Sequence, residues 1–195
     1  MTEAILFQDI ETTGFDRYRN TILVWAGVFT DLNLNILEKK EIRFRPMDNE
    51  VWDDGAEEIH GISSFEAYRY DSKENGLSSM LSTLGKYKIK EAVEHSKNKF
   101  DSKFLMAFFD KSDMIFELRK HYDLDKVLST VKIAKEAGYK KNGLKDWAKR
   151  IGFHLDHHDA MSDTLCCLEV YKFLTGKSNI KIRGDVSGSS QQSFF

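Results

Sequence analysis

The order of strand-like and helix-like segments constrains this chain more than any other feature. Three segments near the N-terminus have the β-branched, aromatic or alternating character of strands, and they are Ala4–Phe7, Thr21–Thr30 and Ile36–Arg45. A turn at residues 31–35 joins the second to the third, so we expect an antiparallel meander. Pro46 ends the third strand. It is the only proline among 195 residues, which argues against a loop-rich sandwich.

The rest of the chain is expected to be mainly helical. After a short helix ending near His60, helices are expected at Leu77–Phe100 (broken at Gly85), Ser112–His121, Leu144–Ile151 and Ala160–Leu174. A further element of open type covers Leu128–Ala137. The continuous apolar run Phe104–Phe109 is typical of a strand covered on both faces. Together the segments predict an α/β domain with a mixed β-sheet flanked by helices over residues 1–176, followed by a flexible tail over 177–195.

Composition limits the class of protein. With 41% hydrophobic and 31% charged residues and a net charge of −2, the chain is typical of a soluble globular protein, and it does not coat nucleic acid by bulk charge. Cys166 and Cys167 are adjacent, so we expect free thiols in a reducing compartment. No apolar run approaches the roughly 18 residues of a membrane span, and the acidic start is unlike a signal peptide. The cytoplasm is therefore expected.

Two acids follow the first strand. Asp9 and Glu11 are two positions apart, so in an extended chain they share one face. Paired carboxylates repel each other unless a cation lies between them, and ligands that are all oxygen suit Mg²⁺ or Mn²⁺. Two solvated acids on an edge strand are the alternative.

A histidine and an acid begin the last helix. Asp163 falls in its first turn, where a carboxylate can hold a metal ion or simply complement the helix dipole. His158 lies on the loop just before, and an imidazole with a pKa near ~6.5 suits a general base. The alternative for His158 is an ordinary surface histidine. A further acid is expected between the two motifs, and Asp110 and Asp113 are the candidates. Both also have the spacing of a helix capping box.

These motifs, in this order, resemble the DEDDh 3′→5′ exonucleases. The resemblance rests on the runs Asp9–Gly14, Ile59–Ile62, Asp113 with Phe116, Gly143–Lys145 and His158–Asp163, and it covers about residues 4–176. The group contains RNase T, oligoribonuclease, exonuclease I and the proofreading subunit of the bacterial replicative polymerase. It implies a ribonuclease-H-like fold and hydrolysis of a terminal phosphodiester that releases 5′-mononucleotides.

The resemblance also implies roles for single residues. Asp9, Glu11, Asp113 and Asp163 would bind two Mg²⁺ ions, with Mn²⁺ as an alternative, and His158 would be the general base. Thr12 and Thr13 would contact the 3′-terminal nucleotide, and Phe108 or Phe109 would stack on a base unless both are strand core. The chain departs from the family in the middle motif. There the usual His-Asn-Ala-x-Phe-Asp run is replaced by Phe108–Asp113.

Local charge favours a nucleic-acid partner. Basic residues outnumber acids between Lys132 and Arg150, and Lys140 and Lys141 are the candidates for backbone contacts. A solvated helix face is the alternative. Single-stranded DNA is the expected substrate. An RNA-trimming enzyme of the same family and a catalytically silent binding module stay open, as does a place beside a polymerase in replication or repair.

Two further hypotheses concern a zinc site and the C-terminus. A zinc site would use His154, His157 and His158 with the two cysteines, but the spacing matches no familiar pair of ligand motifs. The C-terminal Gln191, Ser193, Phe194 and Phe195 resemble the short peptide with which replication proteins dock on the bacterial sliding clamp, because paired aromatic anchors can fill an apolar groove. An unstructured end is the alternative.

Overall fold

A computed structural model describes residues 1–47 and 50–178. The tail predicted from residue 177 lies almost wholly outside these residues, and so do Gln191, Ser193, Phe194 and Phe195. Clamp docking therefore stays a prediction.

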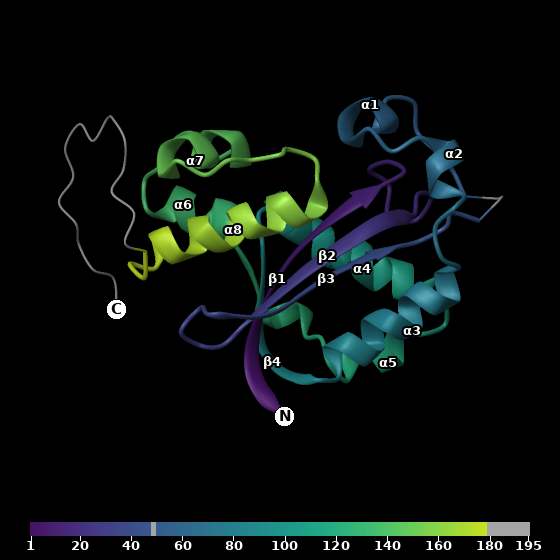
Figure 1. Ribbon diagram of the computed structural model, residues 1–195, viewed down its shortest axis with the longest axis horizontal. Helices are drawn as coiled ribbons and strands as arrows, with labels where there is room; N and C mark the ends of the chain where they lie inside the picture. The colour runs from purple at the N-terminus through teal and green to yellow at the C-terminus, as the bar shows by residue number, and fades with distance from the viewer. Residues whose placement is uncertain (48–49, 179–195) are drawn as a thin grey trace.

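A single five-stranded sheet organises the described chain (Figure 1). Its strands are β1 (Thr2–Thr12), β2 (Ile22–Thr30), β3 (Ile36–Arg43), β4 (Tyr87–Glu94) and β5 (Val127–Ser129), in the spatial order β3-β2-β1-β4-β5. The first three strands pair antiparallel, as the predicted meander requires, whereas β4 pairs parallel to β1 and β5 parallel to β4. The predicted mixed sheet is confirmed.

Eight α-helices surround the sheet in the described residues. They are α1 (Ala56–His60), α2 (Ser64–Ala67), α3 (Lys73–Leu84), α4 (Phe100–Asp110), α5 (Ile115–Arg119), α6 (Thr130–Glu136), α7 (Leu144–Ile151) and α8 (Ala160–Leu174), with 3₁₀ turns at Lys97–Lys99 and Leu124–Lys126. The predicted bounds of α7 and α8 are confirmed. Among the residues that the structure describes, no helix combines the length and the apolarity needed to cross a bilayer.

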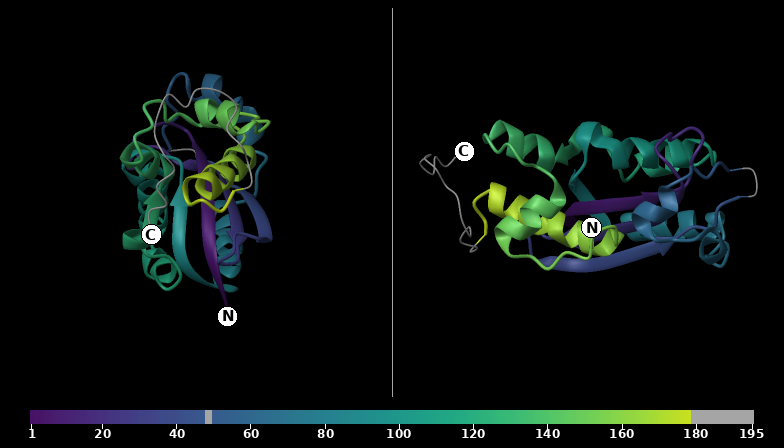
Figure 2. Two further views of the ribbon diagram at one scale, coloured as in Figure 1. Left: turned by 90° about the vertical axis from the view of Figure 1, so that its left-hand side faces the viewer. Right: turned by 90° about the horizontal axis from the view of Figure 1, so that it is seen from above.

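The two faces of β1 pack against different helices. Leu6 and Ile10 join the core formed with α3, α4 and α5, whereas Ile5 and Phe7 pack against residues of α8. Since side chains alternate along a strand, Asp9 and Glu11 continue the row of Ile5 and Phe7 toward α8. At this end of β1, α1 and α2 lie on one side and α6 and α7 on the other (Figure 1), and the view from above in Figure 2 shows the same separation.

Two element predictions were wrong. Phe104–Phe109 lies inside α4 and is not a strand, and residues 87–94, expected to be helical, form β4. A short continuous apolar run cannot be assigned by periodicity alone, and here its large side chains fill one core from two successive turns of a helix. In β4 the burial of successive residues alternates at first and is then continuous, because the strand enters the middle of the sheet.

Candidate metal centre

Three carboxylates from β1 and α8 converge at one point. Oxygens of Asp9, Glu11 and Asp163 lie within 4.8 Å of one another. The antiparallel register of β1 with β2 fixes the first two, which lie opposite Ala26 and Val24. Asp163 stands in the first turn of α8, which Asp159 caps by accepting a hydrogen bond from the amide of Ser162 at 2.8 Å. The strand and the capped helix thus hold all three acids on rigid elements.

Asp101 is a fourth acid beside them. It lies in the first turn of α4 and is only 4% exposed. Burial, followed by the charge of Asp101, raises the pKa of Asp9. Burial, followed by the charges of Glu94 and Glu11, raises the pKa of Asp101. Oδ2 of Asp101 is buried and has no hydrogen-bond partner among the described residues. An oxygen of this kind fits a cation ligand, since a buried carboxylate oxygen is otherwise hydrogen-bonded.

The electrostatics of the cluster favour a cation. Burial, followed by the charges of Asp163 and Asp159, raises the pKa of Glu11 to about 8. Burial also raises the pKa of Asp9, Asp101 and Asp163 above the ordinary value. Acids that resist ionisation because they repel each other bind divalent cations that compensate their charge. The donor set is all oxygen, which suits a hard ion such as Mg²⁺ or Mn²⁺.

Two histidines border the cluster on the loop before α8. The amide of His158 donates to Oδ2 of Asp163 at 3.3 Å, and Nδ1 of His157 lies 3.1 Å from the same oxygen. Their rings stack with centroids 3.8 Å apart. His158 has a φ of 69°, a left-handed conformation that is strained for a residue with a side chain. Burial, followed by the charge of His157, lowers the pKa of the His158 imidazole, so it is neutral at neutral pH.

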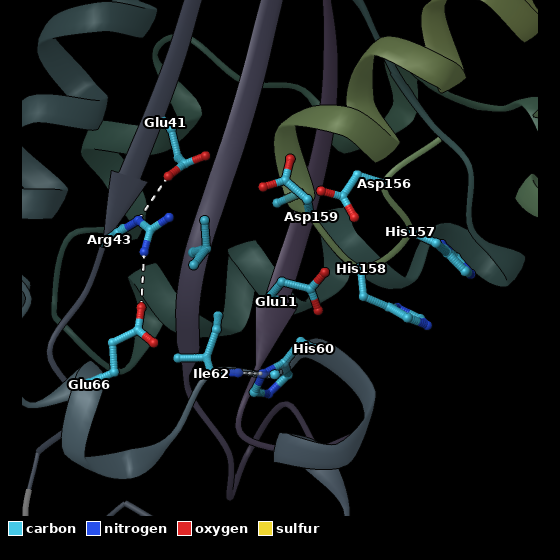
Figure 3. Close-up of a pocket in the computed structure, with 13 residues that line it drawn as sticks. Glu11, Glu41, Arg43, His60, Ile62, Glu66, Asp156, His157, His158 and Asp159 are labelled. Carbon is cyan, nitrogen blue, oxygen red and sulfur yellow. Dashed lines mark hydrogen bonds and ion pairs between the residues drawn. The ribbon is translucent and has the colours of Figure 1, made fainter. Parts of the chain in front are cut away.

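Two hollows meet at these residues. A groove of about 1190 Å³ extends from Asp9, Glu11 and Asp163 toward β5 and α6, and its basic lining consists of Lys97, Lys99, Lys103, Lys132, Lys135 and Lys140. A smaller pocket of about 290 Å³ lies on the other side of Glu11. Figure 3 shows Glu11 between His157 and His158 on one side and a chain of three paired side chains, Glu41, Arg43 and Glu66, on the other.

Several predicted site residues lie elsewhere. Asp113 is exposed in the turn after α4, and Phe108 and Phe109 are fully buried in the core, so neither ring can stack on a base. Thr13 is also buried. Its hydroxyl donates to the carbonyl of Val51 at 2.7 Å and accepts from the amide of Thr21, so its one proton is already used within the protein.

The other residues predicted to contact substrate, Thr12, Lys140 and Lys141, differ in their positions. Thr12 is partly exposed, and its hydroxyl donates to the carbonyl of Gly14 at 2.7 Å. Lys140 lines the large groove, whereas Lys141 is exposed and is not among the lining residues. The cysteines of the zinc hypothesis are buried within α8, and within residues 1–47 and 50–178 they join no group of side chains that could hold a metal.

The sequence contains a signal for Asp101. The family run His-Asn-Ala-x-Phe-Asp ends in Phe-Asp, and the segment His95–Asp101 begins with His, contains Asn98 and ends in Phe100-Asp101. The run is one residue longer than the family pattern. Asn98 and Lys99 both adopt left-handed conformations there, which accommodates the extra residue between β4 and α4. Because a strand was wrongly predicted at residues 104–109, Asp113 was expected at a strand-to-helix junction, where binding groups gather.

Comparison with known proteins finds a matching family model and similar solved structures. The exonuclease family model of the RNase T type matches residues 6–171. A product-bound structure of exonuclease I superposes with a TM-score of 0.76 at 19% identity over 90% of this chain and 44% of that one. E. coli exonuclease I in complex with a dT13 oligonucleotide gives 0.78 at 18% over 90% and 42%. A zinc-bound form of its complex with single-stranded DNA gives 0.75 at 19% over 91% and 41%.

These structures share the ribonuclease-H-like α/β fold, which the sequence predicted. The chain spans less than half the length of the exonuclease I chains. No curated protein sequence matches it.

Proposed function

Because this chain belongs to the RNase T family of exonucleases, we propose that it hydrolyses single-stranded DNA from the 3′ end and releases 5′-mononucleotides. The observation that carries the proposal is the convergence of Asp9, Glu11 and Asp163 within 4.8 Å, with the unpartnered oxygen of Asp101 beside them. Exonuclease I binds oligonucleotides such as dT13 on the same fold, which favours a single strand as the substrate.

Asp9, Glu11, Asp101 and Asp163 would hold two divalent cations, Mg²⁺ or Mn²⁺. A pair of such ions would lower the pKa of a water molecule, so that it loses its proton and becomes a nucleophile, and would stabilise the charge that develops on the attacking and leaving oxygens. The acids stand on β1, α4 and α8, so their positions are largely fixed before the substrate arrives. Asp113, our first choice from the sequence, is replaced by Asp101 in this proposal.

His158 would act as the general base. Its imidazole is partly exposed beside Glu11, and its lowered pKa leaves a ring nitrogen free to accept the proton of the attacking water at neutral pH. The hydrogen bond from its amide to Asp163 ties this loop to the acids, so the imidazole stays at the rim of the centre.

The lysine-lined groove would carry the strand. Lys97, Lys132 and Lys140 project into a hollow that ends at the acids, and phosphate groups are the natural partners of such a lining. Phe15 is 74% exposed directly after the Thr12–Gly14 turn, and its ring lies 6.4 Å from that of Phe100, the neighbour of Asp101. Phe15 takes over the base-stacking role predicted for Phe108 and Phe109.

The smaller pocket favours a strand end that carries a hydroxyl. Its wall includes Glu66, Asp156 and Asp159 besides Glu11, and its one arginine, Arg43, is already paired with Glu41 and Glu66. Carboxylates accept hydrogen bonds from a sugar hydroxyl and repel a terminal phosphate. This supports an unphosphorylated 3′ end as the substrate.

The test uses end-labelled oligonucleotides of DNA and RNA with either a 3′-hydroxyl or a 3′-phosphate. Wild-type protein in Mg²⁺ or Mn²⁺ should shorten 3′-hydroxyl DNA one nucleotide at a time, and EDTA or Asp9→Ala should stop the reaction. Cleavage by Asp9→Ala at the wild-type rate would refute the site. Faster cleavage of RNA would assign the chain to the RNA-trimming members, and tight binding without cleavage would make it a binding module.

A further inference from the structure

A fifth carboxylate lies behind the metal centre. Glu94 is the last residue of β4 and is fully buried. Its Oε2 accepts hydrogen bonds from the hydroxyl of Ser102 and, at 3.0 Å, from the amide of Ser102. Its Oε1 accepts from the hydroxyl of Ser96, which in turn accepts from the amide of Phe100 at 2.9 Å. Glu94 therefore reaches the amides on both sides of Asp101.

These contacts replace the ordinary cap of α4. Lys99 occupies the N-cap position in a left-handed conformation, and its side chain accepts no capping hydrogen bond. The first amides of a helix need acceptors, and a negative charge at this end is favourable. Here the neighbouring strand supplies both through Glu94. The start of α4, and with it the position of Asp101, depends on this carboxylate.

A buried chain of hydrogen bonds continues from α4 to the strand that carries Asp9. The hydroxyls of Ser102 and Tyr122 are 2.6 Å apart, and Nε2 of Gln8 donates to Tyr122 at 2.7 Å. Gln8 also accepts from the indole of Trp25 at 3.3 Å, which fixes its amide. Gln8 directly precedes Asp9, so one polar network joins the backbones on which two of the acids stand.

Packing alone does not explain a carboxylate at this place. Glu94 is fully buried and its charge acts on both Asp9 and Asp101. A buried charge without a cation as partner is costly. An uncharged side chain could fill the same volume at less cost in stability. Residues that orient metal ligands from behind are retained for the geometry they impose on the ligand.

We propose that Glu94 is a positioning residue that holds Asp101 in register with Asp9 by capping α4 from the adjacent strand. The inference rests on the proposed function in that it takes these acids as ligands of divalent ions. Glu94 itself touches Ser96 and Ser102 and needs no contact with substrate.

The experiment compares three variants. Glu94→Asp keeps the charge but is one methylene shorter and cannot reach Ser102. Ser102→Ala removes one donor and leaves all charges in place. Glu91→Asp makes the same shortening on the same strand, where the side chain meets only the hydroxyl of Tyr171 in the described structure, at 3.4 Å. Binding of Mn²⁺ without nucleic acid is measured by electron paramagnetic resonance, and kcat and KM are measured on a DNA oligonucleotide. Melting in EDTA verifies the fold.

Glu94→Asp should weaken Mn²⁺ binding by about tenfold or more and lower kcat at subsaturating metal. Ser102→Ala should weaken Mn²⁺ binding and lower kcat to a smaller extent. KM for DNA should be unchanged in both variants. Glu91→Asp should behave as wild type. Wild-type affinity in both Glu94→Asp and Ser102→Ala would overturn the inference. If Glu94→Asp does not fold, Ser102→Ala decides alone. A wild-type protein that binds no Mn²⁺ would instead refute the proposed function, so the two failures are distinguishable.

Discussion

Asp101 and Asp113 stand at opposite ends of α4. Asp101 lies in the first turn of the helix and Asp113 in the turn that follows its last residue, Asp110. At 1.5 Å per residue the 11-residue helix is about 16 Å long, so only one of these acids can lie beside Asp9. Burial, followed by the charge of Asp101, raises the pKa of Asp9, so Asp101 is the acid of the two that lies near it.

Exchanging each acid for its amide separates the two candidates. Asp101→Asn should lower the rate of nucleotide release by about 100-fold or more, because a metal ligand is removed. Asp113→Asn, at an exposed position, should stay within about twofold of wild type. The measurement is kcat/KM on a single-stranded oligonucleotide at saturating Mg²⁺. The opposite ranking would restore the assignment first made from the sequence.

The part of the centre that the sequence predicted depends on local rules. Asp9 and Glu11 share a face because side chains alternate along a strand, and Asp163 falls in the first turn of a helix whose bounds the apolar pattern predicts. The meander and α7 were predicted for the same reason. In each case a few neighbouring residues determine the geometry.

The part that was missed depends on contacts between distant segments. The apolar run Phe104–Phe109 is equally compatible with a strand and with a buried helix. Only its packing against distant segments of the core on one face of the sheet decides between the two. Glu94 on β4 caps the neighbouring helix α4, so no local capping motif in the sequence predicts this contact. Phe15 was overlooked because an exposed aromatic after a turn has no periodic pattern.

The groove lysines should bind the strand through its phosphates. Replacing Lys132 and Lys135 together by alanine should weaken binding of single-stranded DNA and reduce the slope of log K against log salt by about 0.7 for each phosphate that is no longer neutralised. Replacing Lys39 and Lys40 on β3, which line neither hollow, is the matched control. Fluorescence anisotropy over a salt series measures both slopes, and equal slopes would move the strand away from this groove.

The metal-free protein should lose stability as the pH rises from 6.5 to 8. Glu11 has a pKa of about 8 in the folded chain against 4.5 in the unfolded chain, so over this window the folded state keeps a proton that the unfolded state has released. Below pH 6.5 the buried His95, whose pKa is lowered to about 4, acts in the opposite direction.

Thermal melts in EDTA at several pH values measure this dependence. Mg²⁺ should raise the melting temperature more at pH 8 than at pH 6.5, because it replaces protons on the acids. Glu11→Gln should flatten the slope in EDTA. A melting temperature that rises between pH 6.5 and 8 in EDTA would contradict the raised pKa.

His157 should make the enzyme sensitive to zinc. Nitrogens of His157 and His158 and an oxygen of Asp163 lie within 4.8 Å of one another, and zinc prefers imidazole ligands far more than Mg²⁺ does. Zinc should therefore inhibit the Mg²⁺-dependent reaction, and His157→Gln should raise the inhibitory concentration by about tenfold. His154→Gln, on the exposed part of the same loop, should change nothing. Equal inhibition of the wild type, His157→Gln and His154→Gln would exclude a role for His157 in zinc binding.

Diffraction from crystals soaked in Mn²⁺ decides whether acids from β1, α4 and α8 form one divalent metal centre. We expect anomalous density enclosed by Asp9, Glu11, Asp101 and Asp163, and its disappearance in Asp9→Asn crystals. Density elsewhere, or none at millimolar Mn²⁺ in the wild-type crystals, would contradict it.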